Sequence, residues 1–382
     1  MPGATQKELD KRRLVGVNAE TITNVTTTEY PGHYPGEDHS WNLEHFRKGF
    51  NVKFHFSSPY HSVFSLTGLD TSIANAFRRI LLSEIPTLAI EDVYVNNNTS
   101  IIADEVLCHR LGLIPLRVQH LQGLKEMHWY FKRPADEAEA AELPETFQES
   151  IPTTENTVAL RLQAECNWRS DGKKLWEQGE REPTRLYEGS NVYAHQIVYE
   201  PHGEQQDILG TIAPVNPDIL IAKLRPGQKI DLRMHCYKGI GADHAKWSPV
   251  CTASYRLLPT VEITRPILGN EARKFARCFP KGVIGFEKVS KEEASMDGSG
   301  YERREGEEKA VVVDTFRDTV SRECLRHEEF KDKVKLGRVR DHFIFSVEST
   351  GQYTSDELFV EAVKVLVGKC KRFRGNLQQL QE

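Results

Sequence analysis

The chain has 382 residues, of which 39% are hydrophobic and 27% charged, with a formal net charge of −5 and an isoelectric point near 6.3. This composition is typical of a globular protein long enough for two domains. No run approaches the roughly 18 apolar residues of a membrane span, and the N-terminus MPGATQKELDKRR is too polar for a secretory signal. The acidic balance argues against a chain that binds nucleic acid along its length, because such domains often have a pI above about 9. We expect a cytosolic or nuclear protein.

Seven cysteines are scattered through the chain. They form no CxxC pair and no Cys/His cluster at zinc-ligand spacing, so we expect buried, reduced thiols. We predict no metal and no other cofactor. The basic clusters KRR (11–13), RRE (303–305) and KCKRFR (369–374) are typical of solvated surface. The cysteines are Cys108, Cys166, Cys236, Cys251, Cys278, Cys324 and Cys370.

The first 50 residues are rich in Thr, Asn, Gly, Pro and His, as in TTTEYPGHYPGEDHS. They show no sustained period, so we expect residues 1–50 to form an extended arm that gains order only against other surfaces. From residue 51 the pattern changes, because NVKFHF alternates and HSVFSL follows a Ser-Ser-Pro turn signal. This pattern predicts two strands, followed by a helix.

The helix is predicted in the stretch DTSIANAFRRILLSEIP, which begins at Asp70. Asp70 or Thr71 can cap its first free amides, and Pro86 ends it because the residue before a proline disfavours helical geometry. Arg78 and Arg79 lie side by side on the helix, away from its apolar face. Two interpretations stay open for them: a charged cleft around a small substrate, or a docking face for another protein. The apolar face extends over about three turns and comprises Ile73, Phe77, Ile80 and Leu81, with Glu84 at its end.

The next segments predict a strand, TLAIEDVYVNNN, and a helix, ADEVLCHRLGLIPL. Between about Leu116 and Pro259, an acidic low-complexity linker, KRPADEAEAAELPETFQES, precedes short strand-like runs separated by Pro and Gly. We therefore expect an inserted, mainly β domain over residues 116–259. A charged stretch near residues 290–309 predicts a mobile surface loop. The strand-like runs are TVALRLQAEC, NVYAHQIVYE, KIDLRMHCYKG and SYRLLPTVEI.

The C-terminal part predicts a helix around Asp314–His327, the strand VRDHFIFSVEST and a final helix. Thr354 and Glu357 match the capping box that opens such a helix. The final helix carries two adjoining apolar faces, together wider than the stripe that covers one sheet. Because leaving such side chains exposed favours aggregation, we expect a second subunit to cover them. One face comprises Leu358, Ala362, Val365 and Leu366, and the other Phe359, Val363, Val367 and Cys370.

Specific signals for catalysis do not occur in the sequence. It holds no G-x-x-x-x-G-K-[ST], G-x-S-x-G or H-E-x-x-H motif. Cys108 and His109 are adjacent, and neighbours on a helix do not face each other, so a buried thiol beside an amphipathic imidazole is the simpler interpretation. An enzyme that uses Cys108 or Lys246 remains an alternative, as does a stand-alone nucleic-acid-binding module.

The segment YKGIGADHAKWSPV, residues 237–250, combines two glycines with a cation and an indole. One interpretation is a loop that offers Lys246 and Trp247 to another molecule, because such anchors concentrate binding energy at interfaces. The other is a Gly-rich connection that packs Trp247 into its own core. The sequence alone leaves both open.

Two stretches carry a family resemblance. LTGLDTSIANAFRRILLSEIPTLAIEDVYVNNNTSIIADEVLCHRLGLIPL, residues 66–116, closely resembles the signature of the α-like subunits of cellular RNA polymerases, and KGIGADHAKWSPV resembles a loop of their eukaryotic and archaeal branch. With residues 341–372, the resemblance covers nearly everything from about residue 50 onward. The acidic insert and LRHEEFKDKVKLGRVRDHFIFSVESTGQYT are most similar to the larger α-like subunit shared by RNA polymerases I and III, in the family of bacterial α and archaeal D subunits.

This resemblance implies an α+β fold in which a discontinuous dimerisation domain, residues 51–115 and 260–382, surrounds the inserted β domain. It implies a non-catalytic subunit of the nucleolus and nucleoplasm that forms a heterodimer with the smaller α-like subunit and supports rRNA, 5S rRNA and tRNA transcription. The other implied partners are the second-largest subunits of RNA polymerases I and III and small zinc-bearing shared subunits. No membrane and no direct sequence-specific nucleic-acid binding are expected.

The resemblance also implies site residues, none of them catalytic or metal-binding. Guanidinium groups suit the docking of a large subunit, because their planar fork can bond carboxylates or carbonyls bidentately. The heterodimer interface is expected at Ile73, Phe77, Ile80, Leu81, Phe359, Val363, Leu366 and Val367. Docking of a large subunit is expected at Arg78, Arg79, Lys238, His244, Lys246 and Trp247.

Some archaeal members of this family carry an iron–sulfur cluster in a small domain after the HAKWSPV segment. The corresponding region here, ITRPILGNEARKFARCFPKGVIGFEKV, retains only Cys278. A cluster needs roughly four thiolate ligands. We therefore predict a vestigial ferredoxin-like segment near residues 265–290 without a cluster.

Overall fold

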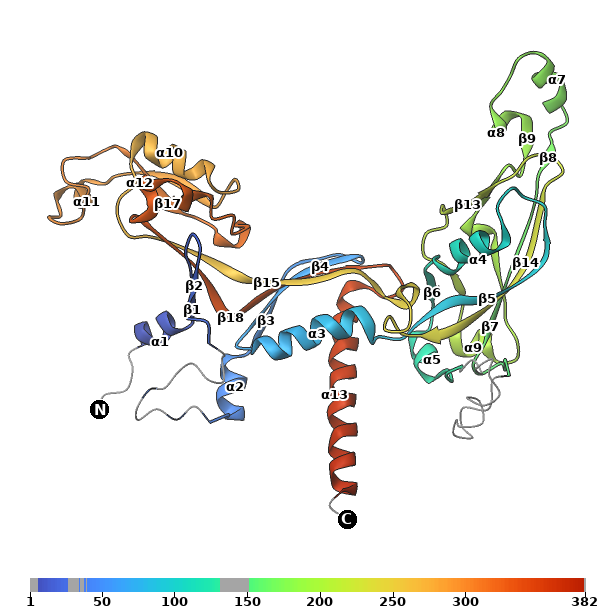
Figure 1. The fold of residues 1–382 in the computed structure, drawn as a ribbon, viewed down its shortest axis with the longest axis horizontal. Coiled ribbons are helices and arrows are strands. Elements are labelled where there is room, and N and C mark those ends of the chain that lie inside the picture. The colour runs from blue at the N-terminus through green and yellow to red at the C-terminus, as the bar shows by residue number, and fades with distance from the viewer. Residues whose placement is uncertain (1–5, 27–33, 35–37, 39, 131–150, 381–382) are drawn as a thin grey trace. The chain divides into compact units, whose positions relative to one another are not determined.

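The computed structural model describes residues 6–26, 34, 38, 40–130 and 151–380 (Figure 1). The acidic linker predicted within residues 116–259 lies outside them. The chain divides into two compact units. Helices and antiparallel sheets occur in both units, which confirms the α+β class. None of the described helices is long and apolar enough to span a bilayer. The first unit comprises Met1–Phe56, Val63–Ala76 and Ser254–Ser346, and the second Ser57–Ser62, Phe77–Ala253 and Val347–Glu382.

A six-stranded sheet supplies most of the first unit. Its order is β2-β1-β18-β4-β3, and β15 also pairs with β18. Phe64 and Phe345 stack in its core with ring centroids 5.4 Å apart. The predicted strands at 51–67 and 339–350 are confirmed. The strands are β1 Leu14–Val17, β2 Ile22–Thr23, β3 Asn51–Ser57, β4 His61–Thr67, β15 Val250–Ile263 and β18 Val334–Ser349.

The N-terminal segment is ordered against its own chain, which corrects the expectation of an arm that gains order only elsewhere. Helix α1 (Gln6–Arg12) leads into β1, which pairs antiparallel with β18 from Leu14 opposite Val339. The Arg13 guanidinium donates two hydrogen bonds to Asp341 Oδ1, at 3.0 and 2.8 Å. A further helix, α2, spans Leu43–Gly49. The backbone bonds of β1 are thus satisfied within the chain.

A smaller layer of the first unit packs around Phe275 and Phe330, which are fully buried. The helix predicted over Asp314–His327 is wrong: the segment forms two 3-10 turns, Thr315–Arg317 and Glu323–Arg326. Val320 has φ +57°, and left-handed backbone at a β-branched residue interrupts an α-helix. The elements here are α10 Gly269–Arg277, β16 Ile284–Lys288, α11 Lys291–Ser295, β17 Glu308–Val312 and α12 Glu328–Lys331.

The charged stretch predicted as a loop at 290–309 contains a short helix, α11, opened by a capping box at Ser290 and Glu293. Lys309 anchors the stretch, because its Nζ lies 2.5 Å from Glu293 Oε1 while the residue is only 8% exposed. The pairing with Glu293 raises the pKa of Lys309. The stretch is therefore more structured than its composition indicated.

The second unit contains a four-stranded antiparallel sheet in the order β11-β7-β14-β5. Its apolar side chains form one extended core with those of α4 and α5. Most predicted strands are confirmed, but NVYAHQIVYE is split by a 3-10 turn at Ala194–Gln196. The main elements are β5 Thr87–Asn98, α4 Asp104–Gly112, α5 Leu121–Glu126, β7 Val158–Glu165, β11 Ile197–Glu200, α9 Gln205–Leu209 and β14 Lys229–Gly239.

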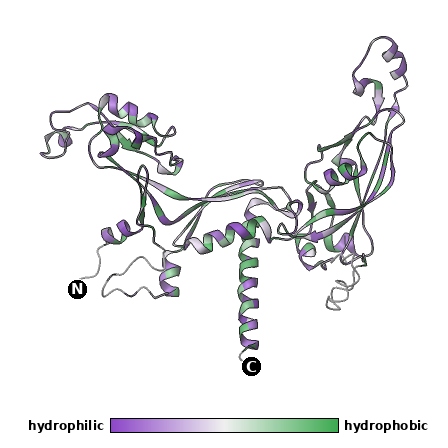
Figure 2. Ribbon diagram, viewed as in Figure 1, coloured by the Kyte–Doolittle hydropathy of each residue, from purple (hydrophilic) through white to green (hydrophobic). Residues whose placement is uncertain are grey.

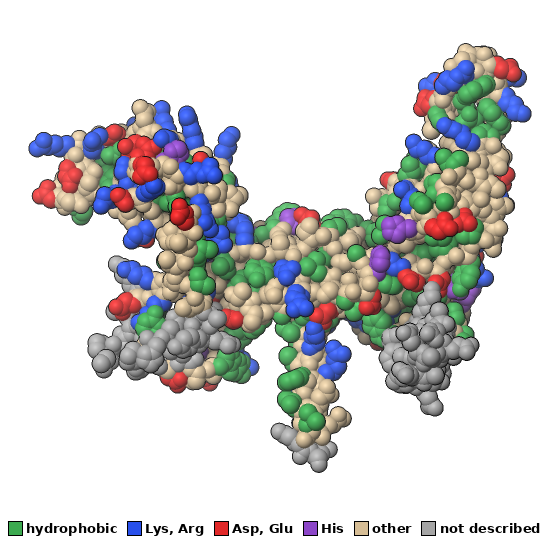
Figure 3. Space-filling view, in the orientation of Figure 1, with side chains coloured by type: hydrophobic (Ala, Val, Ile, Leu, Met, Phe, Trp, Pro, Cys, Tyr) green, Lys and Arg blue, Asp and Glu red, His purple; other side chains and the backbone are tan. Residues whose placement is uncertain are grey.

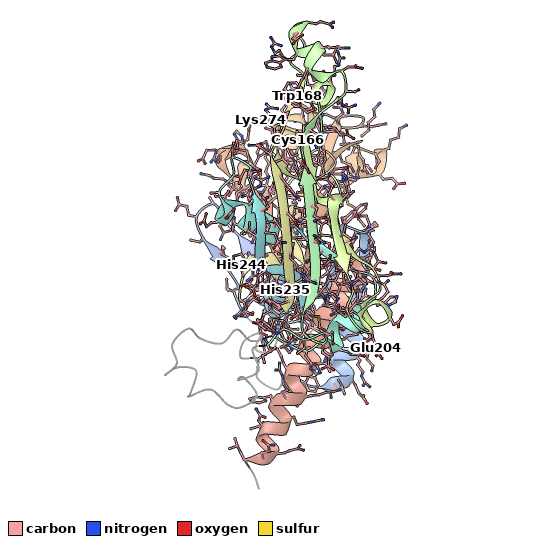
Figure 4. All side chains as sticks on the ribbon, turned by 90° about the vertical axis from the view of Figure 1, so that its right-hand side faces the viewer. Cys166, Trp168, Glu204, His235, His244 and Lys274 are labelled. Atoms are coloured by element: carbon pink, nitrogen blue, oxygen red, sulfur yellow. The ribbon has the colours of Figure 1, made fainter. Side chains whose placement is uncertain are left out.

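Shorter elements complete the second unit. Trp168 and Tyr187 meet edge to face, with ring centroids 4.9 Å apart, where β8 pairs with β9. Cys166 and Trp168 lie toward the same end of the sheet (Figure 4). Residues 116–253 of the predicted insert share their unit with residues 77–115 and 347–382, whereas residues 254–259 belong to the first unit. The predicted boundaries of the insert are therefore not those of the unit. The elements are β6 Leu116–Val118, β8 Asn167–Trp168, α7 Gly172–Glu177, α8 Pro183–Leu186, β9 Tyr187–Glu188, β10 Asn191–Tyr193, β12 Ile212–Pro214 and β13 Leu220–Lys223.

Two helices carry the predicted interface. Helix α3 spans Thr71–Ser83 and helix α13 spans Ser355–Gln379, as the sequence predicted. The capping box is confirmed, because the Thr354 amide donates to Glu357 Oε2 at 2.9 Å. At the start of α3, Asp70 Oδ2 accepts from the Ser72 amide at 3.0 Å.

Candidate protein interaction surface

The beginning of α13 is held firmly within the second unit. Leu358 and Ala362 are buried, and the Ser355 hydroxyl lies 2.5 Å from that of Ser62. The hydroxyl of the buried Tyr353 donates to the Pro86 carbonyl at 2.7 Å, and burial raises its pKa. The first two turns of α13 are therefore part of the core of this unit.

Helices α3 and α13 touch each other through their side chains. The Phe77 and Phe359 rings stack with centroids 5.9 Å apart and planes 17° apart. Lys369 Nζ lies 2.6 Å from Glu84 Oε1, just beyond the end of α3. An aromatic contact and an ion pair thus link α13 to α3 and to the residue that follows it.

A second ion pair fixes α13 from another direction. Glu361 Oε1 lies 2.7 Å from Lys125 Nζ and 2.9 Å from Lys364 Nζ. Burial alone would raise the pKa of Glu361, but the two ammonium groups hold it below its usual value. The carboxylate therefore stays ionised and links α13 to α5.

The residues predicted for the heterodimer interface fall into two groups. Ile80 and Leu81 are each 1% exposed, so they belong to the chain's own core and cannot offer a surface. We therefore revise the predicted interface to exclude them. The remaining predicted residues are at least partly accessible: Ile73, Phe77, Phe359, Val363 and Leu366 are half-buried, and Val367 is 46% exposed.

The distal half of α13 exposes more apolar surface than the sequence analysis identified. Phe373 is 67% exposed and Leu380 83%, with Val360 and Leu377 also exposed. Figure 2 shows apolar residues recurring along α13, and Figure 3 shows hydrophobic side chains at its surface. Exposed apolar side chains grouped on one helix make this part of α13 a candidate interaction site. Their spacing of three and four residues continues the apolar pattern of residues 355–370, so the sequence carries a signal for them.

The predicted docking arginines lie on α3. Arg78 is half-buried and Arg79 is exposed. Ile80 follows them on the same helix and is buried. The helix therefore has a covered apolar side and an accessible side that includes Arg79, which agrees with the amphipathic pattern.

The loop between β14 and β15 is packed against its own unit. The Trp247 indole Nε1 donates to the Tyr237 carbonyl at 3.1 Å, and a Cβ on Gly239 would lie only 2.3 Å from that ring. Lys246 Nζ donates to the Ile90 carbonyl at 2.8 Å and contacts the Glu91 carboxylate. Of the two interpretations of this loop, the structure supports the one in which Trp247 packs into its own unit.

The other two predicted docking residues of this region, Lys238 and His244, differ in their exposure to solvent. Lys238 is 5% exposed; its Nζ donates to the carbonyls of Lys125 and Met127, and burial lowers its pKa. A lysine enclosed in this way cannot dock a partner, so we withdraw it from the predicted surface. His244 is exposed beside the sheet (Figure 4), with its Nδ1 accepting from the Lys246 amide at 3.1 Å.

The surroundings of Cys108 and Lys246 do not favour the reactivity that the enzyme alternative requires. Burial and the nearby Asp104 and Glu105 raise the pKa of Cys108, which disfavours the thiolate that a nucleophile requires. The Lys246 ammonium is engaged by Glu91, as described above. Within the described ranges, no three His, Cys, Asp or Glu side chains are arranged to hold a metal ion.

The region of the predicted vestigial segment contains a second thiol near the first. Cys278 and Cys324 are both buried in the same apolar core of the first unit. Burial raises the pKa of Cys324 to about 12, with Cys278 adding to the shift. These two groups are protonated core residues.

The described structure defines an α+β protein with exposed apolar side chains on α13. Comparison with known proteins specifies its family. Residues 63–370 match the family model described as the RNA polymerase Rpb3/Rpb11 dimerisation domain. The DNA-directed RNA polymerases I and III subunit RPAC1 of Saccharomyces cerevisiae is 45% identical over 360 residues, covering 94% of this chain and 96% of that protein. The protein of the same name from Mus musculus is 43% identical over 380 residues, covering 99% of each chain.

More distant relatives are also similar over most of the chain. The DNA-directed RNA polymerases II, IV and V subunit 3 of Arabidopsis thaliana is 27% identical over 321 residues, covering 82% of this chain and 87% of that protein. This chain belongs to the RNA polymerase Rpb3/Rpb11 dimerisation family.

Proposed function

We propose that the chain is the larger α-like subunit of RNA polymerases I and III and forms a heterodimer with the smaller α-like subunit. The observation that carries this proposal is the exposed apolar side of α13, whose base is fixed to α3 through Phe77 and Phe359. The names of the relatives at 43–45% identity support the assignment to polymerases I and III. The discontinuous domain of residues 51–115 and 260–382 is part of this proposal.

The heterodimer serves as an assembly platform in this proposal. The second-largest subunits of polymerases I and III dock near Arg78, Arg79 and His244, and small zinc-bearing shared subunits join them. The chain itself takes no catalytic part, and it acts in the nucleus, in nucleolus and nucleoplasm, where rRNA, 5S rRNA and tRNA are transcribed. Lys246 and Trp247 hold the loop that carries His244 in place, through their contacts with Glu91 and Tyr237.

Co-expression tests the proposal directly. The chain expressed alone should be poorly soluble, because α13 exposes apolar side chains, and co-expression with the smaller α-like subunit should yield a soluble one-to-one complex. Size-exclusion chromatography with light scattering measures both. An isolated chain that stays soluble and monomeric at high concentration and does not bind the smaller subunit would contradict the proposal. Strong, salt-dependent nucleic-acid binding by the isolated chain would instead support the binding-module alternative.

A further inference from the structure

Positive charge gathers at the end of helix α10 in the first unit. Arg277 is the last residue of α10, Lys281 follows four residues later, and both are exposed. The other basic residues of α10 are paired with carboxylates, whereas these two have no ion-pair partner in the part of the chain that the structure describes. Figure 3 shows Lys and Arg side chains projecting from this part of the first unit.

Two arginines from a later segment of the chain lie beside these cations. Arg317 adjoins Gly282, because a Cβ on that glycine would be only 2.8 Å from Arg317 Nη1. Arg322 follows Ser321, whose hydroxyl donates to the Cys278 carbonyl at 3.5 Å. Both contacts are made to residues directly beside the two cations at the end of α10, so the four basic side chains share one region of the surface. We call Arg277, Lys281, Arg317 and Arg322 the basic patch.

The backbone that presents Arg322 is strained. Val320 has φ +57° and Arg322 φ +60°, a left-handed conformation that disfavours residues with a side chain, above all β-branched ones. The turn is fixed at both ends: the Asp318 carbonyl accepts from Arg256 Nη1 at 3.0 Å, and Cys324 is buried in the apolar core. Strain that the surrounding structure enforces in this way is typical of ligand clamps. The fold thus holds an arginine where a glycine would fit the backbone better.

The surroundings of the basic patch favour an acidic protein segment over a nucleic-acid backbone. Arg317 Nε lies 3.2 Å from Asp314 Oδ2, and Arg326 Nη1 lies 3.2 Å from Glu323 Oε2. These two carboxylates would repel an unbroken row of phosphates. Val313, which is 67% exposed, directly precedes Asp314 and offers an apolar contact. A peptide can place its carboxylates on the guanidinium groups and an apolar side chain on Val313.

We infer that the basic patch docks an acidic segment of another protein, and that the strained turn presents Arg322 to it. Among the described residues, the Arg322 guanidinium donates only to the Ala19 carbonyl, at 3.4 Å. Most of its five donors are therefore available to a carboxylate, which a guanidinium binds bidentately. The basic patch shares no residue with the surfaces proposed above for the smaller and second-largest subunits, so this inference goes beyond the proposed function.

Biolayer interferometry on the full chain tests the inference. The chain is held through a C-terminal tag, so that the result does not depend on the proposed heterodimer. The probes are a peptide of about 12 residues with Asp and Glu around one Leu, the same peptide with Asn and Gln in place of the acids, and a single-stranded DNA of about 12 nucleotides. In 0.1 M salt the acidic peptide should bind about fivefold or more tightly than either other probe. The difference should shrink in 1 M salt, where the Debye length falls from about 10 Å to about 3 Å. DNA or the neutral peptide binding as tightly as the acidic peptide would overturn the inference.

Three variants separate docking from folding. Arg322→Gly should weaken binding of the acidic peptide by about fivefold or more, yet it should not lower the melting temperature, because glycine adopts this backbone without strain. Arg303→Gly is the matched control: Arg303 also has φ +60° but lies between α11 and β17, outside the basic patch, so it should bind the peptide as wild type does. Lys281→Gln removes an exposed charge without altering the strained turn, and it should also weaken binding.

Each combination of results decides the question. Loss of binding by Arg322→Gly and Lys281→Gln, with Arg303→Gly unchanged, would support the inference. Equal losses in Arg322→Gly and Arg303→Gly would overturn it, because they would reflect net charge alone. A loss confined to Arg322→Gly would also contradict it, since a shared patch requires the neighbouring cation as well. If Arg322→Gly binds as wild type and melts at a lower temperature, the strained turn serves the fold and the inference fails.

Discussion

At the scale of single residues, the contact between Phe77 and Phe359 joins the two helices of the candidate surface. The rings stack at 5.9 Å, and both remain partly accessible. Each therefore supports its own chain and can also meet a partner. A residue with this double role is sensitive to charge, because a carboxylate buried without a partner pays a large desolvation cost.

Phe77→Asp should abolish the heterodimer. The new carboxylate would lie against the Phe359 ring and the partner, both apolar surroundings that disfavour a charge. Phe77→Leu keeps an apolar side chain and loses only the aromatic contact, worth about 0.5–1.5 kcal/mol, so it should still form the complex. Co-purification of the smaller subunit measures both. Equal yields of complex from the two variants would show that Phe77 lies outside the interface.

The double variant Arg78→Ala, Arg79→Ala should leave the heterodimer intact and weaken recruitment of the second-largest subunit. Alanine preserves the helix but removes the guanidinium forks that we propose for docking. Quantitative mass spectrometry of the purified assembly measures both partners in one sample. If this variant and Phe77→Asp fail at the same step, α3 does not have two separate functional faces.

His55 and His342 form a pH-sensitive pair in the first unit. Their Nε2 atoms lie 2.7 and 2.9 Å from the hydroxyl oxygen of the buried Ser65. Burial lowers both pKa values, with smaller contributions from Lys53 near His55 and from His55 and Arg13 near His342. Asp314 and Asp341 oppose these shifts. Both imidazoles are therefore neutral in the folded state near pH 7.

Because both folded-state pKa values are depressed, the unfolded chain binds protons more readily, and stability should fall as pH decreases from 6.5 through the folded pKa values. Well above pH 6.5 the imidazoles are neutral in both the folded and the unfolded state, so the full stability should be present there. Thermal unfolding of the wild-type complex and of a His55→Gln, His342→Gln variant between pH 7.5 and 5.5 measures this. A variant that loses as much stability as wild type over this range would rule out the pair as the source.

At the scale of elements, close backbone approach decides how the loop after β14 is held. Gly239 leaves space for the Trp247 ring, and Gly241 leaves space for the Leu82 carbonyl, where a Cβ would lie only 2.4 Å away. A side chain at either position would overlap the neighbouring group, because the backbone of the loop packs directly against it. The sequence showed two glycines and an indole but not which of them would meet.

Gly239→Ala should therefore destabilise the second unit by about 1–3 kcal/mol, the usual cost of overpacking. Its Cβ would overlap the Trp247 ring, which has a backbone carbonyl beside it and cannot retreat freely. Gly368→Ala, on α13 with nothing within 4 Å of the added Cβ, is the matched control and should not destabilise. Denaturant unfolding followed by Trp fluorescence reports the difference. Unchanged stability of Gly239→Ala would mean that the ring has room to move.

At the scale of the whole molecule, the N-terminal segment completes the sheet of the first unit. Strand β1 bonds to β18, and Arg13 pairs with the mostly buried Asp341. Removal of residues 1–26 would leave one edge of β18 unpaired and Asp341 without its guanidinium. Unpaired backbone groups and a charge without a partner both destabilise.

The heterodimer that lacks residues 1–26 should therefore have a lower melting temperature than the full-length heterodimer, by several degrees. Differential scanning calorimetry of the two complexes measures this, and removal of residues 1–5 alone provides the control. If the deletion left the melting temperature unchanged, the expectation from composition would hold instead, in which the segment is an arm ordered only by other subunits.

The sequence by itself determined the elements whose periodicity is local. The capping box at Thr354, the run NVKFHF and the helix before Pro86 depend on neighbours within a few residues, so they could be predicted. The tertiary structure alone decided which polar groups are enclosed: Lys238 is buried by carbonyls more than 100 residues away, and Ile80 and Leu81 are enclosed by the fold. It also decided that β1 pairs with β18 across more than 300 residues. Long-range packing sets burial, and burial decides whether a side chain serves the core or a partner.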